Sequence, residues 1–151
     1  MSFTFGIHFS VFNNFAVERI GLQPQYLGIL ESVREIPGLL GALIGGLLVR
    51  YPDTRMAGLA LLLFGAGFIG CSQITTAPLL IALSFVWSVG FHTWYPLADG
   101  INLRLSEPHE RGRRLGQIRS VGAVATILGI GTVYLLAQPL GYPTMYVLAG
   151  I

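Results

Sequence analysis

The chain has 151 residues, of which 53% are hydrophobic and only 11% are charged, and its mean hydropathy is +0.67. Soluble domains carry about 25% charged residues, so this composition excludes an ordinary soluble domain and indicates an integral membrane protein. The formal net charge is only +2, and every basic residue is an arginine in one of a few short segments, which excludes a nucleic-acid-binding surface and informs membrane topology instead.

Residues 3–16 are apolar and aromatic and are predicted to form a first helix, which His8, Asn13 and Asn14 interrupt with polar groups. A spanning helix needs about 20 residues, so we expect the first turn of this helix to lie upstream. The segment lacks a basic amino-terminal region and a small-residue cleavage site, unlike a signal peptide. His8 either lies on a solute or proton pathway or, more simply, makes an interhelical hydrogen bond.

A turn over residues 17–25 leads into a second predicted helix over residues 26–49. Its first turns carry Glu31, Arg34 and Glu35. Spacings of three and four residues place these side chains side by side, where they partly neutralise one another. The trio is either an outer gate or solute anchor, or a self-neutralised group whose long side chains reach the headgroups.

The same helix carries glycines further along this face. Gly38, Gly41 and Gly45 are spaced so that another helix backbone can approach closely, as small residues allow in membranes. Pro37 leaves a backbone carbonyl without its helical hydrogen bond and is predicted to bend the helix between the charged residues and the glycines. These glycines are therefore candidates for helix packing.

A polar turn over residues 50–55 contains Arg50, Asp53 and Arg55. The third predicted helix, residues 56–74, contains no charged residue. Because nothing in it needs a polar partner, this helix can face lipid.

The fourth predicted helix, residues 77–104, is long enough to cross a bilayer but is not uniformly apolar. At about 100° per residue, polar side chains share one face of it: Ser84, Ser88, His92, Tyr95, Asp99 and Asn102. Aromatic side chains share another face: Trp87, Phe91 and Trp94. An ionisable residue at mid-bilayer costs at least about 2.5–3.5 kcal/mol, so the polar face is predicted to line a watery cavity, with a bend at Pro96.

His92 and Asp99 form the sharpest pair on that face. Seven residues apart, they could share a proton pathway or contact a solute, together with Tyr95 and Ser88. The simpler alternative is that Asp99 pairs with an arginine such as Arg104 or Arg119 and that His92 satisfies a neighbouring backbone carbonyl.

Residues 103–117 are the most charged segment and lead into a fifth predicted helix over residues 115–136. One face of this helix carries small residues suited to packing: Gly122, Thr126 and Gly129. Residues 138–143 are a predicted turn, and residues 144–151 begin a sixth apolar segment. The expected fold is therefore an all-α, six-helix transmembrane bundle in a single domain over residues 1–151, with its first and last helices truncated.

Arginines are distributed unequally between the two sides of this bundle. One side has only Arg19, and the other has the arginines of the second-to-third and fourth-to-fifth connections: Arg50, Arg55, Arg104, Arg111, Arg113, Arg114 and Arg119. The positive-inside rule places the arginine-rich side in the cytoplasm. It predicts a cytoplasmic amino terminus. We expect the protein to be located in the inner or plasma membrane.

No catalytic motif or phosphate-binding loop is present, and we expect no enzymatic activity, no cofactor and no metal. Ser88 and His92, four residues apart, are the single pair that resembles a nucleophile and a base. Their place on the polar face explains both residues more simply than catalysis does. Cys71 is the only cysteine, which excludes a disulfide framework and a cysteine-based metal site.

Two connections resemble those of the major facilitator superfamily. Residues 45–55 (GGLLVRYPDTR) are similar to that family's loop signature, Gly-x-x-x-Asp-Arg-x-Gly-Arg-Lys/Arg. Gly45 and Arg50 match, whereas Val49, Pro52 and Asp53 replace the signature aspartate, glycine and first basic residue. Residues 110–116 (ERGRRLG) look like the start of the fifth helix in many members.

The resemblance covers essentially the whole chain and implies the amino-terminal half of a secondary transporter. In such a half, the first and fourth helices line the central cavity, the second and fifth pack against the opposite half, and the third lies outside. The loop arginines and Asp53 would contribute to a cytoplasmic gate: Arg50, Asp53, Arg55, Arg111, Arg113 and Arg114. The implied partners are membrane lipid, a small solute, and a missing second half or a second copy.

A non-transport interpretation stays open. A small membrane protein could assemble with itself or a partner through the glycine faces of the second and fifth predicted helices. Continuation of the gene into six more helices would favour the transporter, whereas a stop codon there would leave the cavity unclosed unless two copies pair.

Overall fold

The computed structural model describes the backbone of residues 1–48 and 51–151, and the side chains of all of these except residues 42–48. The prediction for Arg50 and the packing predicted for Gly45 lie outside the described residues. All regular structure in the described part is helical: α1 (Ser2–Asn14), α2 (Leu27–Leu48), α3 (Asp53–Cys71), α4 (Ala77–Arg104) and α5 (Arg111–Gly150). Short π and 3-10 turns, Phe15–Arg19 and Pro24–Tyr26, connect α1 to α2.

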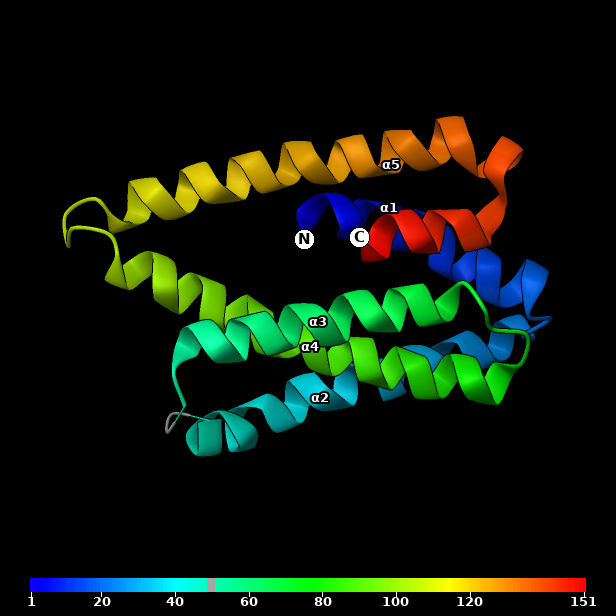
Figure 1. Cartoon of the computed structure of the whole chain (residues 1–151), viewed down its shortest axis with the longest axis horizontal. Coiled ribbons are helices and arrows are strands. Elements are labelled where there is room, and N and C mark those ends of the chain that lie inside the picture. Colours follow the sequence, from blue (N-terminus) through cyan, green and yellow to red (C-terminus); the bar gives the residue numbers. More distant parts are fainter. Residues whose placement is uncertain (49–50) are drawn as a thin grey trace.

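The predicted count of six helices is not confirmed, because the described residues form five α-helices. The fifth has 40 residues and is broken at Gly141, where φ is 76° and ψ is 161°. Only glycine adopts such a backbone easily, so the chain reverses direction at one residue rather than through a longer loop. The last stretch then runs back alongside the bundle (Figure 1). Pro139 and Pro143 flank the break.

The helices form two groups that lie side by side (Figure 1). α1 packs on α5, whereas α4 packs on both α2 and α3. Glycines bring the backbones together: a Cβ at Gly129 of α5 would lie 3.1 Å from the backbone nitrogen of Ile7 in α1, and one at Gly90 of α4 would lie 2.5 Å from the Ala60 carbonyl of α3. Such close approach is how small residues hold membrane helices together.

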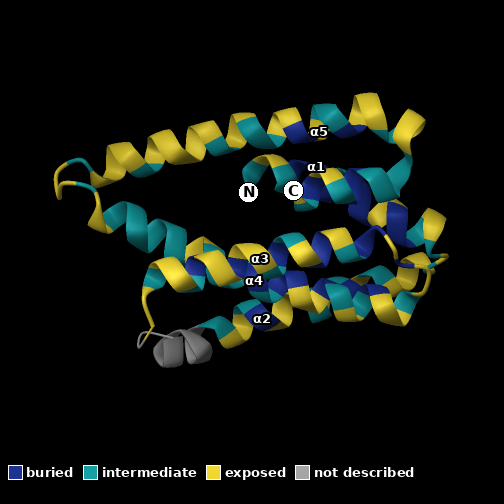
Figure 2. Cartoon of the chain, viewed as in Figure 1, coloured by how far each residue is buried: buried dark blue, intermediate teal, exposed yellow. Residues whose placement is uncertain are grey.

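Buried side chains gather where α1, α3, α4 and the end of α5 meet (Figure 2). An aromatic cluster fills this region, formed by Phe12, Phe68, Trp87 and Tyr146. By contrast, most residues of α5 before Gly141 are exposed (Figure 2), and many of them are apolar. Lipid tails are a suitable solvent for such a surface.

Within the described residues, α3, α4 and α5 are long and apolar enough to cross a membrane. α3 begins at Asp53, earlier than the predicted start at residue 56. Pro52 is the N-cap residue of α3, and the Asp53 carboxylate in the first turn is favourable at the positive end of the helix dipole. The bundle is thus built of several spans, as a multi-pass membrane protein requires.

Candidate functional site

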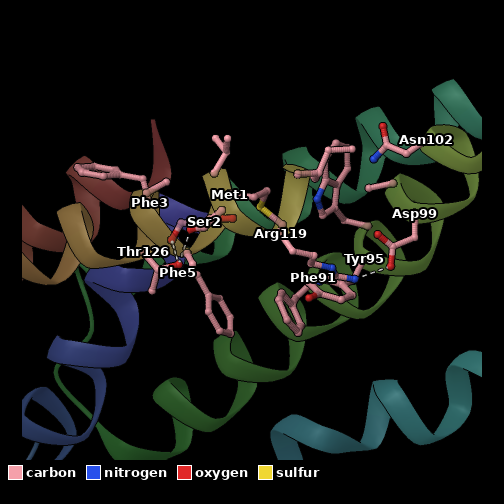
Figure 3. Close-up of a pocket in the computed structure, with 17 residues that line it drawn as sticks. Met1, Ser2, Phe3, Phe5, Phe91, Tyr95, Asp99, Asn102, Arg119 and Thr126 are labelled. Atoms are coloured by element: carbon pink, nitrogen blue, oxygen red, sulfur yellow. Dashed lines mark hydrogen bonds and ion pairs between the residues drawn. The ribbon is translucent and has the colours of Figure 1, made fainter. Parts of the chain in front are cut away.

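A pocket of about 680 Å³ lies between the start of α1, the second half of α4 and the first half of α5. α4 contributes aromatic and polar side chains, and α5 contributes Arg119 and Thr126 (Figure 3). The first residues of α1, including Phe5, form the remaining wall. The volume suits a small solute.

Asp99 and Arg119 carry opposite charges in this pocket. Arg119 Nη2 donates to Asp99 Oδ2 at 2.6 Å, so the pair joins α4 to α5 (Figure 3). The guanidinium also lies over the ring of Tyr95, 4.5 Å from its centroid. The geometry agrees with the alternative in which Asp99 pairs with Arg119, and it leaves both charges facing the pocket.

Apolar and hydroxyl groups complete the pocket. The rings of Phe5 and Phe91 stack with centroids 4.7 Å apart, which ties α1 to α4. Thr126 Oγ1 donates to the Ser2 carbonyl at 3.2 Å, which ties α5 to α1. The pocket therefore combines one ion pair with aromatic faces, and can hold a solute by charge, hydrogen bonds and stacking together.

The polar face of α4 does not line one continuous cavity. Tyr95, Asp99 and Asn102 line the pocket, whereas Ser84 and Ser88 are fully buried. Ser88 Oγ donates to the Arg34 carbonyl of α2. The first part of α4 lies along α2, and its last part runs away from α2 (Figure 1), although Arg104 at its end still pairs with Asp53 of α3. The divided face follows from this divergence.

His92 lies against α2, where it meets the predicted charged trio. Its Nε2 lies 3.3 Å from Glu35 Oε2. Arg34 pairs with Glu31 and lies 3.5 Å from Glu35 Oε1. The structure therefore brings four of the predicted site residues into one cluster, apart from the residues that line the pocket.

Arg34 also connects this cluster to the aromatic interior. Its guanidinium lies 5.5 Å from the ring centroids of both Phe12 in α1 and Trp87 in α4. His8 lies deeper, stacked on Phe68 at 4.8 Å and edge-on to Trp87 at 4.4 Å. Neither ring nitrogen of His8 has a hydrogen-bond partner among the described residues. The structure thus places His8 in the aromatic core rather than along the pocket.

Ion pairs and a hydrogen bond hold the charged connections. Arg104 at the end of α4 pairs with Asp53 at the start of α3. Glu110 pairs with Arg113 and lies 3.6 Å from Arg114 Nε. Arg111 Nε donates to the Leu103 carbonyl at 3.2 Å, across the turn between α4 and α5. Arg55 lies in the first turn of α3.

The predicted packing glycines have different neighbours. Gly129 meets the backbone of α1, and a Cβ at Gly122 would lie 3.0 Å from Ser2 Oγ. A Cβ at Gly38 would lie 2.6 Å from Cε1 of His92, so this glycine accommodates a side chain. A Cβ at Gly41 would have no atom of the described residues within 4 Å.

Sequence reasoning missed several pocket residues. It treated Arg119 as a topology determinant and a partner for Asp99, and it assigned no site role to Phe5 or Trp94, which also line the pocket. One signal was available: Arg119 is three residues before Gly122 and seven before Thr126, which puts all of them on one face of α5.

No group of three or more histidine, cysteine, aspartate or glutamate side chains in the described part of the chain is placed to hold a metal ion. Neither a curated protein nor a solved structure matches the chain. The family model described as Major Facilitator Superfamily matches residues 1–151. Because this match spans the whole chain, the protein belongs to the Major Facilitator Superfamily, a family of membrane transporters.

Proposed function

We propose that the protein is part of a secondary transporter that moves a small solute by alternating access, and that Asp99 and Arg119 bind the solute. The observation that carries this proposal is the ion pair between these residues in a pocket bounded by three helices. Ionisable residues within a membrane are costly and usually mark solute or ion pathways.

The Asp99–Arg119 pair suits a site that alternates between empty and occupied states during a transport cycle. With no solute bound, each charge compensates the other, which lowers the cost of holding them away from bulk water. A solute with charged or hydroxyl groups can replace one partner or bridge both. Tyr95, already beneath the guanidinium, offers an aromatic face to the same solute.

We propose proton coupling at the same carboxylate. Protonation of Asp99 would remove the negative charge that Arg119 contacts, which frees the guanidinium for an anionic or polar group of the solute. Release of that proton would restore the pair and expel the solute.

Alternating access needs a second bundle. We propose that these helices act as a six-helix half, counting the stretch after Gly141 as the sixth, and rock against another half around a site near the midplane. That half would be a further part of a longer chain or a second copy. The arginine-rich connections and the amino terminus would lie in the cytoplasm, and the membrane would be the inner or plasma membrane.

The non-transport alternative depends on glycine faces that are free to bind a partner. Gly129 and Gly122 are covered by α1, and Gly38 is covered by His92. Of the predicted packing glycines that the structure describes, Gly41 alone has open space around it. This distribution favours the transporter.

The test is a screen of solute and proton flux in proteoliposomes that contain the full-length chain. We expect one class of small solutes to accumulate in response to a pH gradient, and Arg119→Gln to abolish that accumulation. His109→Gln, in the exposed turn between α4 and α5, is the control and should transport normally. Unchanged uptake by Arg119→Gln would refute the proposed site.

A further inference from the structure

We propose that His92 of α4 and Glu35 of α2 form a proton-binding site, separate from the solute pocket, that ties α2 to α4 when the imidazole is protonated. The proposal rests on the proposed function for its role in a transport cycle. Its existence as a proton site rests on the charges and packing around His92 alone.

The first argument is the charge of the trio on α2. Glu31 and Glu35 each carry one negative charge and Arg34 carries one positive charge, so the trio is not neutral but has a net charge of about −1. An uncompensated charge is unfavourable within a membrane bundle. A protonated His92, 3.3 Å from Glu35, supplies the missing positive charge.

The second argument is that the imidazole of His92 fits into a space on the surface of α2. Gly38 follows Glu35 by three residues and therefore lies on the same face of α2. A Cβ at Gly38 would lie 2.6 Å from Cε1 and 2.7 Å from Nδ1 of His92, so the ring occupies the space that a side chain would fill. In this position, Nε2 of the ring lies 3.3 Å from Glu35 Oε2.

The other charged groups nearby already have partners. On α2, Arg34 is held by Glu31, and its backbone carbonyl accepts a hydrogen bond from Ser88 of α4. On α4, the next ionisable side chain after His92 is Tyr95, followed by Asp99, which pairs with Arg119 of α5.

The remaining neighbours of the cluster carry little charge. On α1, the ionisable group is His8, whose ring lies against Trp87 beneath the Arg34 guanidinium. α3 packs on α4, and its charged residues, Asp53 and Arg55, are in its first turn. Glu35 is thus the carboxylate available to His92 among the described residues.

Proton binding at this pair would alter how α2 meets α4. Histidine ordinarily changes charge between pH 5 and 8. When the imidazole is charged, its ion pair with Glu35 adds to the Ser88 hydrogen bond and holds the helices together. When it is neutral, the excess negative charge remains on α2 and the contact loosens.

The experiment measures the distance between α2 and α4 as a function of pH in the full-length chain in lipid nanodiscs. Spin labels are placed at Leu39 of α2 and Leu79 of α4, which are 78% and 47% exposed, in a Cys71→Ala background. We expect the distance distribution to shift between pH 8 and pH 5, and the shift to disappear in Glu35→Gln and His92→Gln.

Two further variants make the test specific. Gly38→Ala keeps both titratable groups but displaces the ring, and should also lose the shift. His109→Gln removes an exposed histidine and should keep it. No shift in the parent chain, or a shift that survives in His92→Gln, would overturn the proposal. A shift in a chain that transports no solute would support the proton site and refute only the transport function.

Discussion

Arg119 of α5 and Asp99 of α4 hold each other at 2.6 Å across the pocket, with the Tyr95 ring beneath the guanidinium. Each helix thus brings one charge to the other, and neither charge has to be buried alone. This relationship links the fold to the proposed function, since both residues line the pocket and would present their charges to a solute.

Replacing Asp99 with asparagine should abolish proton-coupled uptake while the protein still inserts in the membrane. The amide keeps the shape but carries no exchangeable charge, and it leaves the Arg119 guanidinium unpaired. We expect uptake in proteoliposomes to fall by at least roughly tenfold. Glu107→Gln, which removes an exposed carboxylate in the turn between α4 and α5, is the matched control and should transport normally. Normal transport by Asp99→Asn would rule out the proposed role of this carboxylate.

The contact between α1 and α5 can be tested with two glycines on α5. A methyl group at Gly129 would overlap the backbone of α1, whereas Gly131 has no described atom within 4 Å of the same position. Gly129→Ala should therefore destabilise the bundle by about 1–3 kcal/mol. Gly131→Ala should have little effect or stabilise slightly. Thermal unfolding in detergent measures both, and equal stability of the two variants would contradict this packing of α1 on α5.

Much of the fold is readable from sequence because its causes are local. The fourth predicted helix, residues 77–104, has the bounds observed for α4, where a proline in the first turn and an arginine in the last mark its ends. The break at Gly141 follows from the glycine and prolines in the predicted turn. The start of α3 was missed because Asp53 was counted with the polar turn rather than as a favourable first-turn residue.

The site is less predictable because it depends on which helices are neighbours. Periodicity alone places Ser88 and Asp99 on one face of α4. It does not show that α2 covers Ser88 while the pocket reaches Asp99. It left open whether the charges on α2 form a gate or neutralise one another, and it did not predict that His92 contacts Glu35. Such pairings arise from tertiary packing, which a single helix pattern does not contain.

Two buried serines on α4 should respond differently to alanine. Ser88 Oγ donates to the Arg34 carbonyl, whereas Ser84 Oγ has no partner among the described residues. Ser88→Ala should lower the free energy of unfolding by about 0.6 kcal/mol, a typical value for a hydrogen bond between membrane helices. Ser84→Ala should be neutral or stabilising because it removes an unsatisfied hydroxyl. Chemical unfolding in mixed micelles compares them, and a larger loss for Ser84→Ala would show that its hydroxyl has a partner.

The division of the polar face of α4 makes a prediction about water access. Asn102 lines the pocket, whereas Ser84 is fully buried. A water-soluble reagent should therefore reach residue 102 and not residue 84. In a Cys71→Ala background, Asn102→Cys should react rapidly with a hydrophilic maleimide added to both sides of the membrane, and Ser84→Cys should stay unmodified. Because a thiol must ionise to react, a site without water reacts slowly even when a path exists. Mass spectrometry after timed labelling gives both rates. Comparable labelling of Ser84→Cys would mean that the whole face is wet, as the sequence pattern alone suggests, and that α2 does not seal the first half of α4.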